Sequence, residues 1–161
     1  MGTSKSGRYI NTRGSGTSAS DFAVIHSNEG TYTHDDNGTL RLVSGGHGQT
    51  GMNQLDKYGI KYTVVKTFAN GVRVGNVDNH KKKNKRSGIG QAWFPKDWKA
   101  KDIRHAGNHV ASLKGNRNAK DGTIVWGVWK GVRVGVIRTH GKIATIFPDN
   151  LKQPNKRSKS K

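Results

Sequence analysis

The pentapeptide Gly-Val-Arg-Val-Gly occurs twice in this chain, at 71–75 and again at 131–135. Each copy follows a run rich in β-branched and aromatic residues, 61–68 in the first case and 123–129 in the second, after a short turn. Two such runs joined through a glycine-containing turn predict an antiparallel hairpin. The repeat has two interpretations: a pattern shared by unrelated edge strands, or two sheet lobes that carry an arginine at matching places.

Shorter patterns complete the prediction of an α+β fold. Strands are predicted at 22–25, 40–43 and 143–147, where apolar residues gather between turn residues. A short helix is predicted at 52–58. A longer helix is predicted over 95–113, because apolar and small residues recur there at helical spacing after a proline.

Composition divides the chain into three parts. Residues 1–20 are rich in Gly, Ser and Thr and predict a flexible linker, and 151–161 predict a basic disordered tail. Only 31% of the residues are hydrophobic, below the usual share for a globular protein. They are concentrated in short runs, however, so a modest core is expected for a single domain at 21–150.

Several classes of protein are excluded or disfavoured by what the sequence lacks. There are no cysteines, which excludes disulfides and argues against a zinc site. No apolar run approaches the length of a transmembrane helix, so we expect no membrane insertion by this segment. The first residues have no apolar core of a signal peptide, and we expect any export signal to lie outside this sequence.

A run of basic residues gives the clearest indication of a partner. The formal net charge is +19, and five of the six residues after His80 are basic. Such charge destabilises a compact domain by self-repulsion, which indicates that it serves a polyanionic partner. Lysines and arginines at phosphates release counterions and give strong, salt-dependent binding. The expected RNA contacts are Lys81, Lys82, Lys83, Lys85 and Arg86.

Histidines are the groups here that titrate near neutrality, and the chain has seven. Cleavage of RNA without a metal needs a base for the 2′-hydroxyl proton, an acid for the leaving 5′-oxygen and a cation for the charged phosphorane. His47 is the best candidate, since flanking glycines let a substrate backbone approach. His26, at the end of a predicted strand, and His80, before the basic run, are alternatives, although each also fits a solvated surface position.

The other histidines fit structural or solvated positions better. His34 and His140 lie in predicted turns. His105 and His109 have a spacing that can bind a metal, but the sequence shows no third ligand. We therefore expect no metal ligands and no cofactor.

Five segments, taken together, resemble the bacterial EndoU nucleases, relatives of the coronavirus uridylate-specific endoribonuclease domain. In order along the chain they lie at 26–30, 44–47, 70–74, 93–98 and 141–148. The resemblance implies two antiparallel sheet lobes with short helices packed outside, a groove between the lobes, and a His-His-Lys site in that groove.

The same resemblance implies particular site residues. The two family histidines match His26 and His47, and the residue that helps to position substrate matches Thr145. The family lysine belongs on the strand that here carries Arg73, so either that arginine or Lys81 would supply the cation. Arginine stabilises charge but does not donate a proton at neutral pH.

A second departure from the family pattern and two further histidines keep alternatives open. Phe147 stands where a tyrosine is common, which retains stacking on a base but removes the hydroxyl and puts strict uridine preference in doubt. His34 offers a different pairing with His47, and His80 could replace either partner.

The sequence thus favours a metal-independent endoribonuclease toxin that acts on RNA, with tRNA as the first substrate to test, and leaves 2′,3′-cyclic phosphate ends. We expect it to be secreted within a larger toxin, to act in the cytoplasm of a target bacterium, and to be neutralised by an acidic immunity protein. Two alternatives remain open: a non-catalytic RNA- or DNA-binding module, and a metal-dependent DNase.

Overall fold

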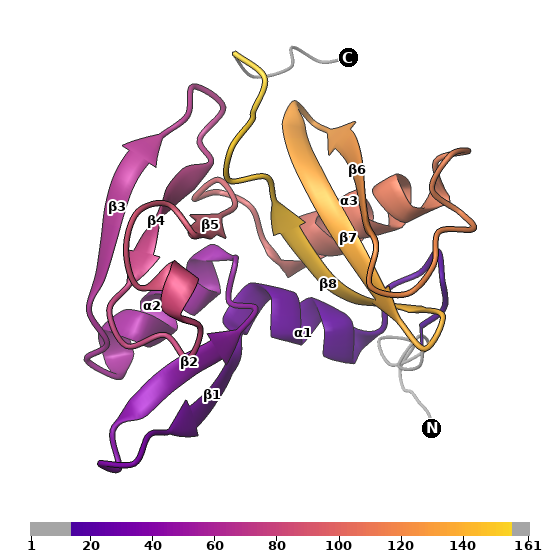
Figure 1. The fold of residues 1–161 in the computed structure, drawn as a ribbon. Coiled ribbons are helices and arrows are strands. Elements are labelled where there is room, and N and C mark those ends of the chain that lie inside the picture. Colours follow the sequence, from indigo (N-terminus) through magenta and orange to yellow (C-terminus); the bar gives the residue numbers. More distant parts are fainter. Residues whose placement is uncertain (1–13, 156–161) are drawn as a thin grey trace.

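The computed structural model describes residues 14–155, and these form three helices of α type, one short 3₁₀ helix and three small antiparallel sheets (Figure 1). The fold is therefore α+β. In chain order the elements are α1 (Asp21–Glu29), β1 (Thr31–His34), β2 (Leu40–Ser44), α2 (Gln49–Lys57), β3 (Tyr62–Thr67), β4 (Arg73–Val77), the 3₁₀ helix η2 (Lys83–Lys85), β5 (Gln91–Trp93), α3 (Ala100–Ser112), β6 (Ile124–Trp129), β7 (Val132–Thr139) and β8 (Lys142–Pro148).

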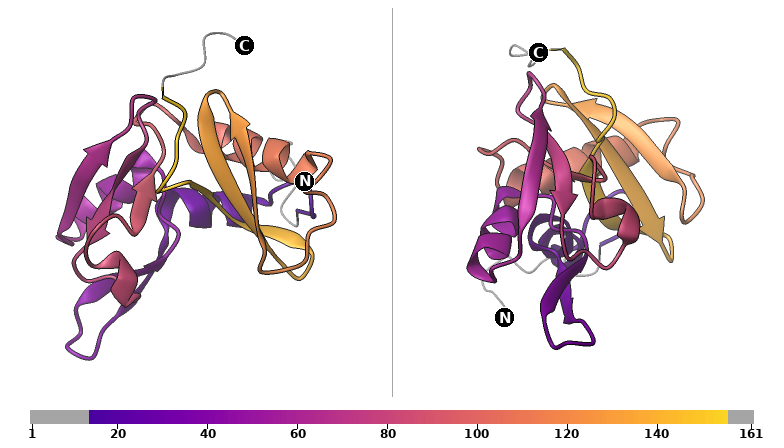
Figure 2. Two further views of the ribbon diagram at one scale, coloured as in Figure 1. Left: turned by 45° about the horizontal axis from the view of Figure 1, so that its top comes forward. Right: turned by 60° about the vertical axis from the view of Figure 1, so that its left-hand side comes forward.

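The repeated pentapeptide forms the centre of two sheets. β4 lies between β3 and β5, and β7 lies between β6 and β8. The interpretation as edge strands is wrong, and the prediction of two sheet lobes is confirmed. Both neighbours of each central strand supply hydrogen bonds, and the branched residues Val74 and Val134 are fully buried. Figure 2 shows the two sheets on either side of α1.

Turns of the two lobes meet at one point. Asn70 Nδ2, in the turn before β4, donates to the carbonyl of Gly131, in the turn before β7, over 3.0 Å. Gln153 bridges both turns, since its Oε1 accepts from Asn70 Nδ2 and from the Arg133 amide. Residues beyond β8 therefore help to hold the lobes together, at the start of the segment predicted to be a basic tail.

The prediction of a strand at 22–25 is wrong, because these residues lie within α1. Ser20 caps this helix: its Oγ accepts from the Ala23 amide over 3.0 Å. Ala23 is buried, whereas Phe22 is 83% exposed and Ile25 is 49% exposed. A run of four apolar residues does not distinguish a strand from a helix by periodicity, and the serine cap decides it.

Two helix starts differ from the sequence prediction, and two short strands, β1 and β5, were not predicted. α3 begins at Ala100, because Pro95 starts a tight turn in which the Trp98 amide donates to the Pro95 carbonyl. α2 begins at Gln49, three residues before the predicted start. β5 was not predicted, since a strand of three residues is too short to show alternation. The hairpin of β3 and β4 and the strands of the second lobe are confirmed.

The core has two parts. The larger lies between α1, α3 and the β6–β8 sheet, and the smaller lies beneath α2 in the first lobe. Part of the predicted linker packs on the larger core: the Gly16 carbonyl accepts from Arg138 Nε, and the Ser15 carbonyl accepts from the Ile143 amide. Residues 1–13 of the linker and 156–161 of the tail lie outside the described residues. Within 14–155, no helix is long and apolar enough to cross a membrane.

Candidate active site at the junction of the two sheets

A glycine-rich loop after β2 docks on the end of α1. The amides of Gly46, His47 and Gly48 donate to the carbonyls of His26, Ser27 and Asn28 over 3.1, 2.6 and 3.1 Å. The last carbonyls of a helix lack an intrahelical partner. This loop supplies partners to those of Ser27 and Asn28 and a second donor to that of His26, which also accepts from the Gly30 amide. Two histidines that are well separated in the sequence are thereby held side by side.

Close contact between the loop and the helix requires glycine. Gly45 has φ +71°, and a Cβ at this position would lie 2.2 Å from the His26 carbonyl oxygen. We expect Gly45→Ala to cost about 1–3 kcal/mol beyond the strain of positive φ, because the backbone must move. Urea unfolding checks this. Gly38→Ala is the matched control, since Gly38 has φ +80° and nothing within 4 Å of its Cβ position. Equal losses in the two variants would contradict the expectation.

The His47 ring lies between the two lobes. Its Nδ1 lies 2.8 Å from the Ala92 carbonyl in β5, and its ring centroid lies 5.9 Å from that of Phe147 in β8. A carbonyl only accepts, so Nδ1 carries the proton and Nε2 keeps a lone pair. Burial, and next the charge of Lys85, lower the pKa of His47 to about 3. At neutral pH its Nε2 is therefore in the form that accepts a proton.

His26 faces the same loop from the end of α1. Its Nδ1 lies 2.8 Å from Thr31 Oγ1 in β1, which sets the orientation of the ring. Burial, and next the charge of Lys82, lower its pKa. The charges of His26 and His47 also affect each other, because protonation of His26 lowers the pKa of His47.

The loop after β4 is built around His80, which is fully buried. Its Nδ1 accepts from the Lys82 amide over 2.9 Å, and its carbonyl accepts from Arg86 Nε over 2.6 Å. Burial, followed by the charges of Lys85, Lys82 and Arg86, lowers the pKa of His80 to about 4. The interpretation of His80 as a solvated loop residue is wrong, because its ring is the internal support of the basic loop.

Lys85 differs from the other basic residues of this loop. Lys81, Lys82, Lys83 and Arg86 are exposed, whereas Lys85 is partly buried, with Nζ 3.5 Å from Gln91 Oε1. Burial, and next the charge of Lys82, lower the pKa of Lys85 to about 8. Its charge is the largest electrostatic influence on His47. The sequence prediction placed Lys85 among the RNA contacts, and no spacing within the run separates it from its neighbours.

Arg73, the cation expected from the sequence, has other contacts. Its guanidinium donates to Gln49 Oε1 over 2.7 Å and to the Phe94 carbonyl over 2.5 Å, and one nitrogen lies 3.5 Å from the Met52 sulfur. These bonds tie α2 to the end of β5. Lys81, the other cation considered, is exposed, and its amide donates to the Leu42 carbonyl.

The remaining sequence candidates lie on β8 and β1. Thr145 and His26 both line a hollow of about 440 Å³ between α1 and β8. Phe147 contacts His47 from the same strand. His34 is exposed at the end of β1, and its side chain does not line the hollow.

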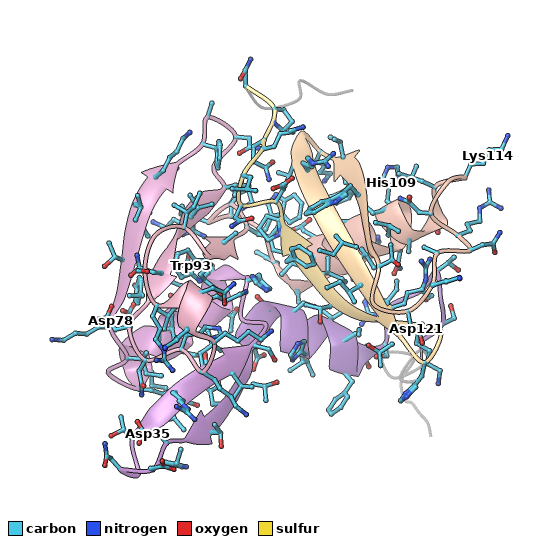
Figure 3. The ribbon with its side chains drawn as sticks, in the orientation of Figure 1. Asp35, Asp78, Trp93, His109, Lys114 and Asp121 are labelled. Atoms are coloured by element: carbon cyan, nitrogen blue, oxygen red, sulfur yellow. The ribbon has the colours of Figure 1, made fainter. Side chains whose placement is uncertain are left out.

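Acidic residues do not gather near these histidines. Figure 3 places Asp35 at the tip of the β1–β2 hairpin, Asp78 at the outer edge of the first lobe and Asp121 at the far side of the second. Among residues 14–155, no group of three or more His, Asp or Glu side chains could hold a metal ion.

The buried histidines make stability depend on pH. The pKa values of His47 and His80 in the folded chain, about 3 and about 4, lie below the value of 6.5 for a free histidine. Between pH 4 and 6.5 the unfolded chain therefore binds more protons, and stability falls as pH falls. From pH 7.5 to 5.5 we expect the free energy of unfolding to drop by about 2–3 kcal/mol, with similar parts from the two rings.

Urea unfolding at the two pH values measures this drop. His47→Gln should remove about half of it, while the control His34→Gln, at an exposed position, should leave it unchanged. A free energy that is the same at pH 7.5 and 5.5 would contradict the assignment of both rings as neutral in the folded state.

The α+β domain thus brings His26 and His47 to the junction of two antiparallel sheets, beside a strongly basic loop. A family model described as bacterial EndoU nuclease matches residues 21–150. The protein therefore belongs to the bacterial EndoU nuclease family, as the resemblance of the short segments predicted. Neither the curated proteins nor the solved structures compared with the chain gave a match.

Proposed function

We propose that this nuclease is a metal-independent endoribonuclease in which His26, His47 and Lys85 act on one phosphodiester. The observation that supports this most strongly is the placement of the His47 ring beside His26. The ring is neutral at pH 7, and the charge of Lys85 contributes to its lowered pKa. These groups supply the base, the acid and the cation that cleavage through the 2′-hydroxyl needs.

The proposed reaction begins at the 2′-hydroxyl of the substrate. His47 Nε2 takes its proton, and the 2′-oxygen attacks the adjacent phosphorus. The bond from phosphorus to the 5′-oxygen breaks, and His26 gives a proton to that oxygen. The products are a 2′,3′-cyclic phosphate and a 5′-hydroxyl. Lys85 stabilises the charge that develops on the phosphorane oxygens.

Two features adapt the histidines to these roles. Thr31 holds Nδ1 of His26, which leaves Nε2 to face the leaving group. The pKa of the His26 ring is lowered in the free protein. The negative charge of a bound phosphate raises this pKa again, so that the ring is protonated when substrate is bound. Thr145, which lines the same hollow as His26, is the residue that we expect to position the nucleotide.

The biological setting that we propose is delivery into a competing bacterium. The basic loop would draw in RNA, including structured RNA such as tRNA, and an acidic immunity protein would protect the producing cell by covering the site. We propose that the domain is secreted as part of a larger toxin and acts in the cytoplasm of the target.

Incubation of the purified protein with total RNA in EDTA tests the reaction. We expect fragments with 2′,3′-cyclic phosphate and 5′-hydroxyl ends, identified by resistance of the 3′ end to polymerase tailing and by direct labelling of the 5′ end with a kinase. Cleavage that EDTA abolishes would favour the metal-dependent DNase, provided that DNA is also cut. Binding of RNA with no fragments would favour the non-catalytic module.

A further inference from the structure

On one face of the β6–β8 sheet, α1 borders β8 and, within residues 14–155, no helix covers the exposed residues of β6. α3 packs on the opposite face, where a Cβ at Gly127 would meet Leu113 and Val110 of that helix and its C-terminal flank. Figure 1 shows α3 passing behind this sheet. The residues that alternate with Gly127 on β6 face the other way: Val128 is 47% exposed and Ile124 is 42% exposed.

Two aromatic rings meet edge to face on this open face, with 79° between their planes. Trp126 in β6 and Phe147 in β8 both pair with Gly135 in the central strand. A Cβ at Gly135 would lie 2.7 Å from the Trp126 ring and 2.8 Å from the Phe147 ring, so the glycine lets both rings lie over the strand. The ring centroids are 5.6 Å apart, and both side chains are partly exposed.

The aromatic pair continues the active site outward. The Phe147 ring contacts both neighbours: its centroid lies 5.9 Å from that of His47 and 5.6 Å from that of Trp126. Arg133 lies next to Trp126: its guanidinium carbon is 4.7 Å from the centroid of the Trp126 ring. An ion pair with Asp149 fixes the position of the guanidinium. An unbroken series therefore runs from the catalytic histidine through two aromatic rings to a cation.

This arrangement fits unpaired RNA better than it fits another partner. Aromatic rings on an open antiparallel sheet are a common means of stacking successive single-stranded bases, and base edges and phosphates suit an adjacent guanidinium. The net charge of +19 favours a polyanion, and the face is continuous with the site proposed to cleave one.

We propose that the open face binds a second unpaired nucleotide, whose base stacks on Trp126 next to the base that the family resemblance places at Phe147. The enzyme then requires single-stranded RNA for at least one nucleotide beyond the scissile linkage. The proposal rests on the proposed function for the position of the cut, but the binding itself does not. Trp126 is thus a residue that determines which RNA structures are substrates.

Affinity for a short 2′-O-methyl oligoribonucleotide tests the binding without cleavage, because this probe lacks the nucleophile. Trp126→Leu should weaken binding about tenfold or more, which corresponds to the loss of one stacked base. The dependence of affinity on salt should stay the same, since no phosphate contact is removed. Trp129→Leu is the matched control: it lies on the same strand, but its ring contacts Trp98 and His105 on the other side of the sheet.

Probes with a single abasic position give a second readout on the wild-type protein. One position should lose affinity in the wild type and lose none in Trp126→Leu, which assigns that base to the tryptophan. Unchanged affinity in Trp126→Leu, or equal losses in Trp126→Leu and Trp129→Leu, would overturn the proposal and leave the open face for a protein partner. Failure of RNA cleavage in EDTA, with stacking intact, would instead overturn only the proposed function.

Discussion

Replacing Lys85 by methionine is expected to lower kcat/KM for RNA cleavage by about 10²–10³-fold. Methionine keeps most of the length of the side chain and removes the cation, and loss of one preorganised group that stabilises developing charge has an effect of this size. Cleavage of a short oligoribonucleotide with one susceptible linkage measures the change. Lys83→Met is the control, because Lys83 belongs to the same loop and is exposed.

Lys85→Arg separates charge from shape. The pKa of Lys85, about 8, predicts that kcat/KM of the wild type falls as pH rises above 8, when the lysine loses its proton. Arginine stays charged, so this alkaline decline should be absent in Lys85→Arg even if its activity at pH 7 is reduced. Equal effects of Lys83→Met and Lys85→Met would mean that the loop contributes only its general field, and Arg73 would return as the candidate cation.

Replacing His47 by alanine is expected to lower kcat/KM by about 10³-fold or more, since positioned proton transfer contributes about 10²–10⁴-fold. The His47 ring also connects β5 with Phe147. Its removal therefore takes away both the proposed base and a packing contact of the Phe147 ring. Single-turnover cleavage with saturating enzyme measures the chemical step apart from binding.

His34→Ala is the control for His47→Ala, because His34 is exposed at the end of β1. His80→Asn gives a further comparison: if His80 supports the loop without transferring a proton, its variant should lose activity without a change in the acidic limb of the pH profile. Full cleavage by His47→Ala would show that the site assignment is wrong.

Local signals explain which elements could be predicted. The hairpins at β3–β4 and β6–β7 depend on turn residues and on short β-branched runs, and both are properties of adjacent residues. α1 could not be separated from a strand, because its apolar run is short and two of its large apolar side chains face solvent. β5 is defined by its hydrogen bonds to β4 and to the His47 loop, which are distant in the sequence.

Within the site, the sequence proposed several residues and left the choice among them open. The flanking glycines pointed to His47, and the family resemblance gave His26, His47, Thr145 and Phe147. In the structure all four lie around one junction. The cation role that we propose for Lys85 was not anticipated. Lys85 is more buried than the other basic residues of the loop. This difference depends on the conformation of the loop, which is built around the buried His80 ring.

By itself, the sequence determined the excess of positive charge, the two-lobed antiparallel architecture and the membership of a nuclease family, because charge, turn chemistry and family motifs are written in short segments. Only the tertiary structure decided which basic residue of the loop is partly buried, which nitrogen of His47 is free, and which sheet face stays open. Burial and hydrogen bonding between distant segments set these properties, and neither can be read from the order of residues alone.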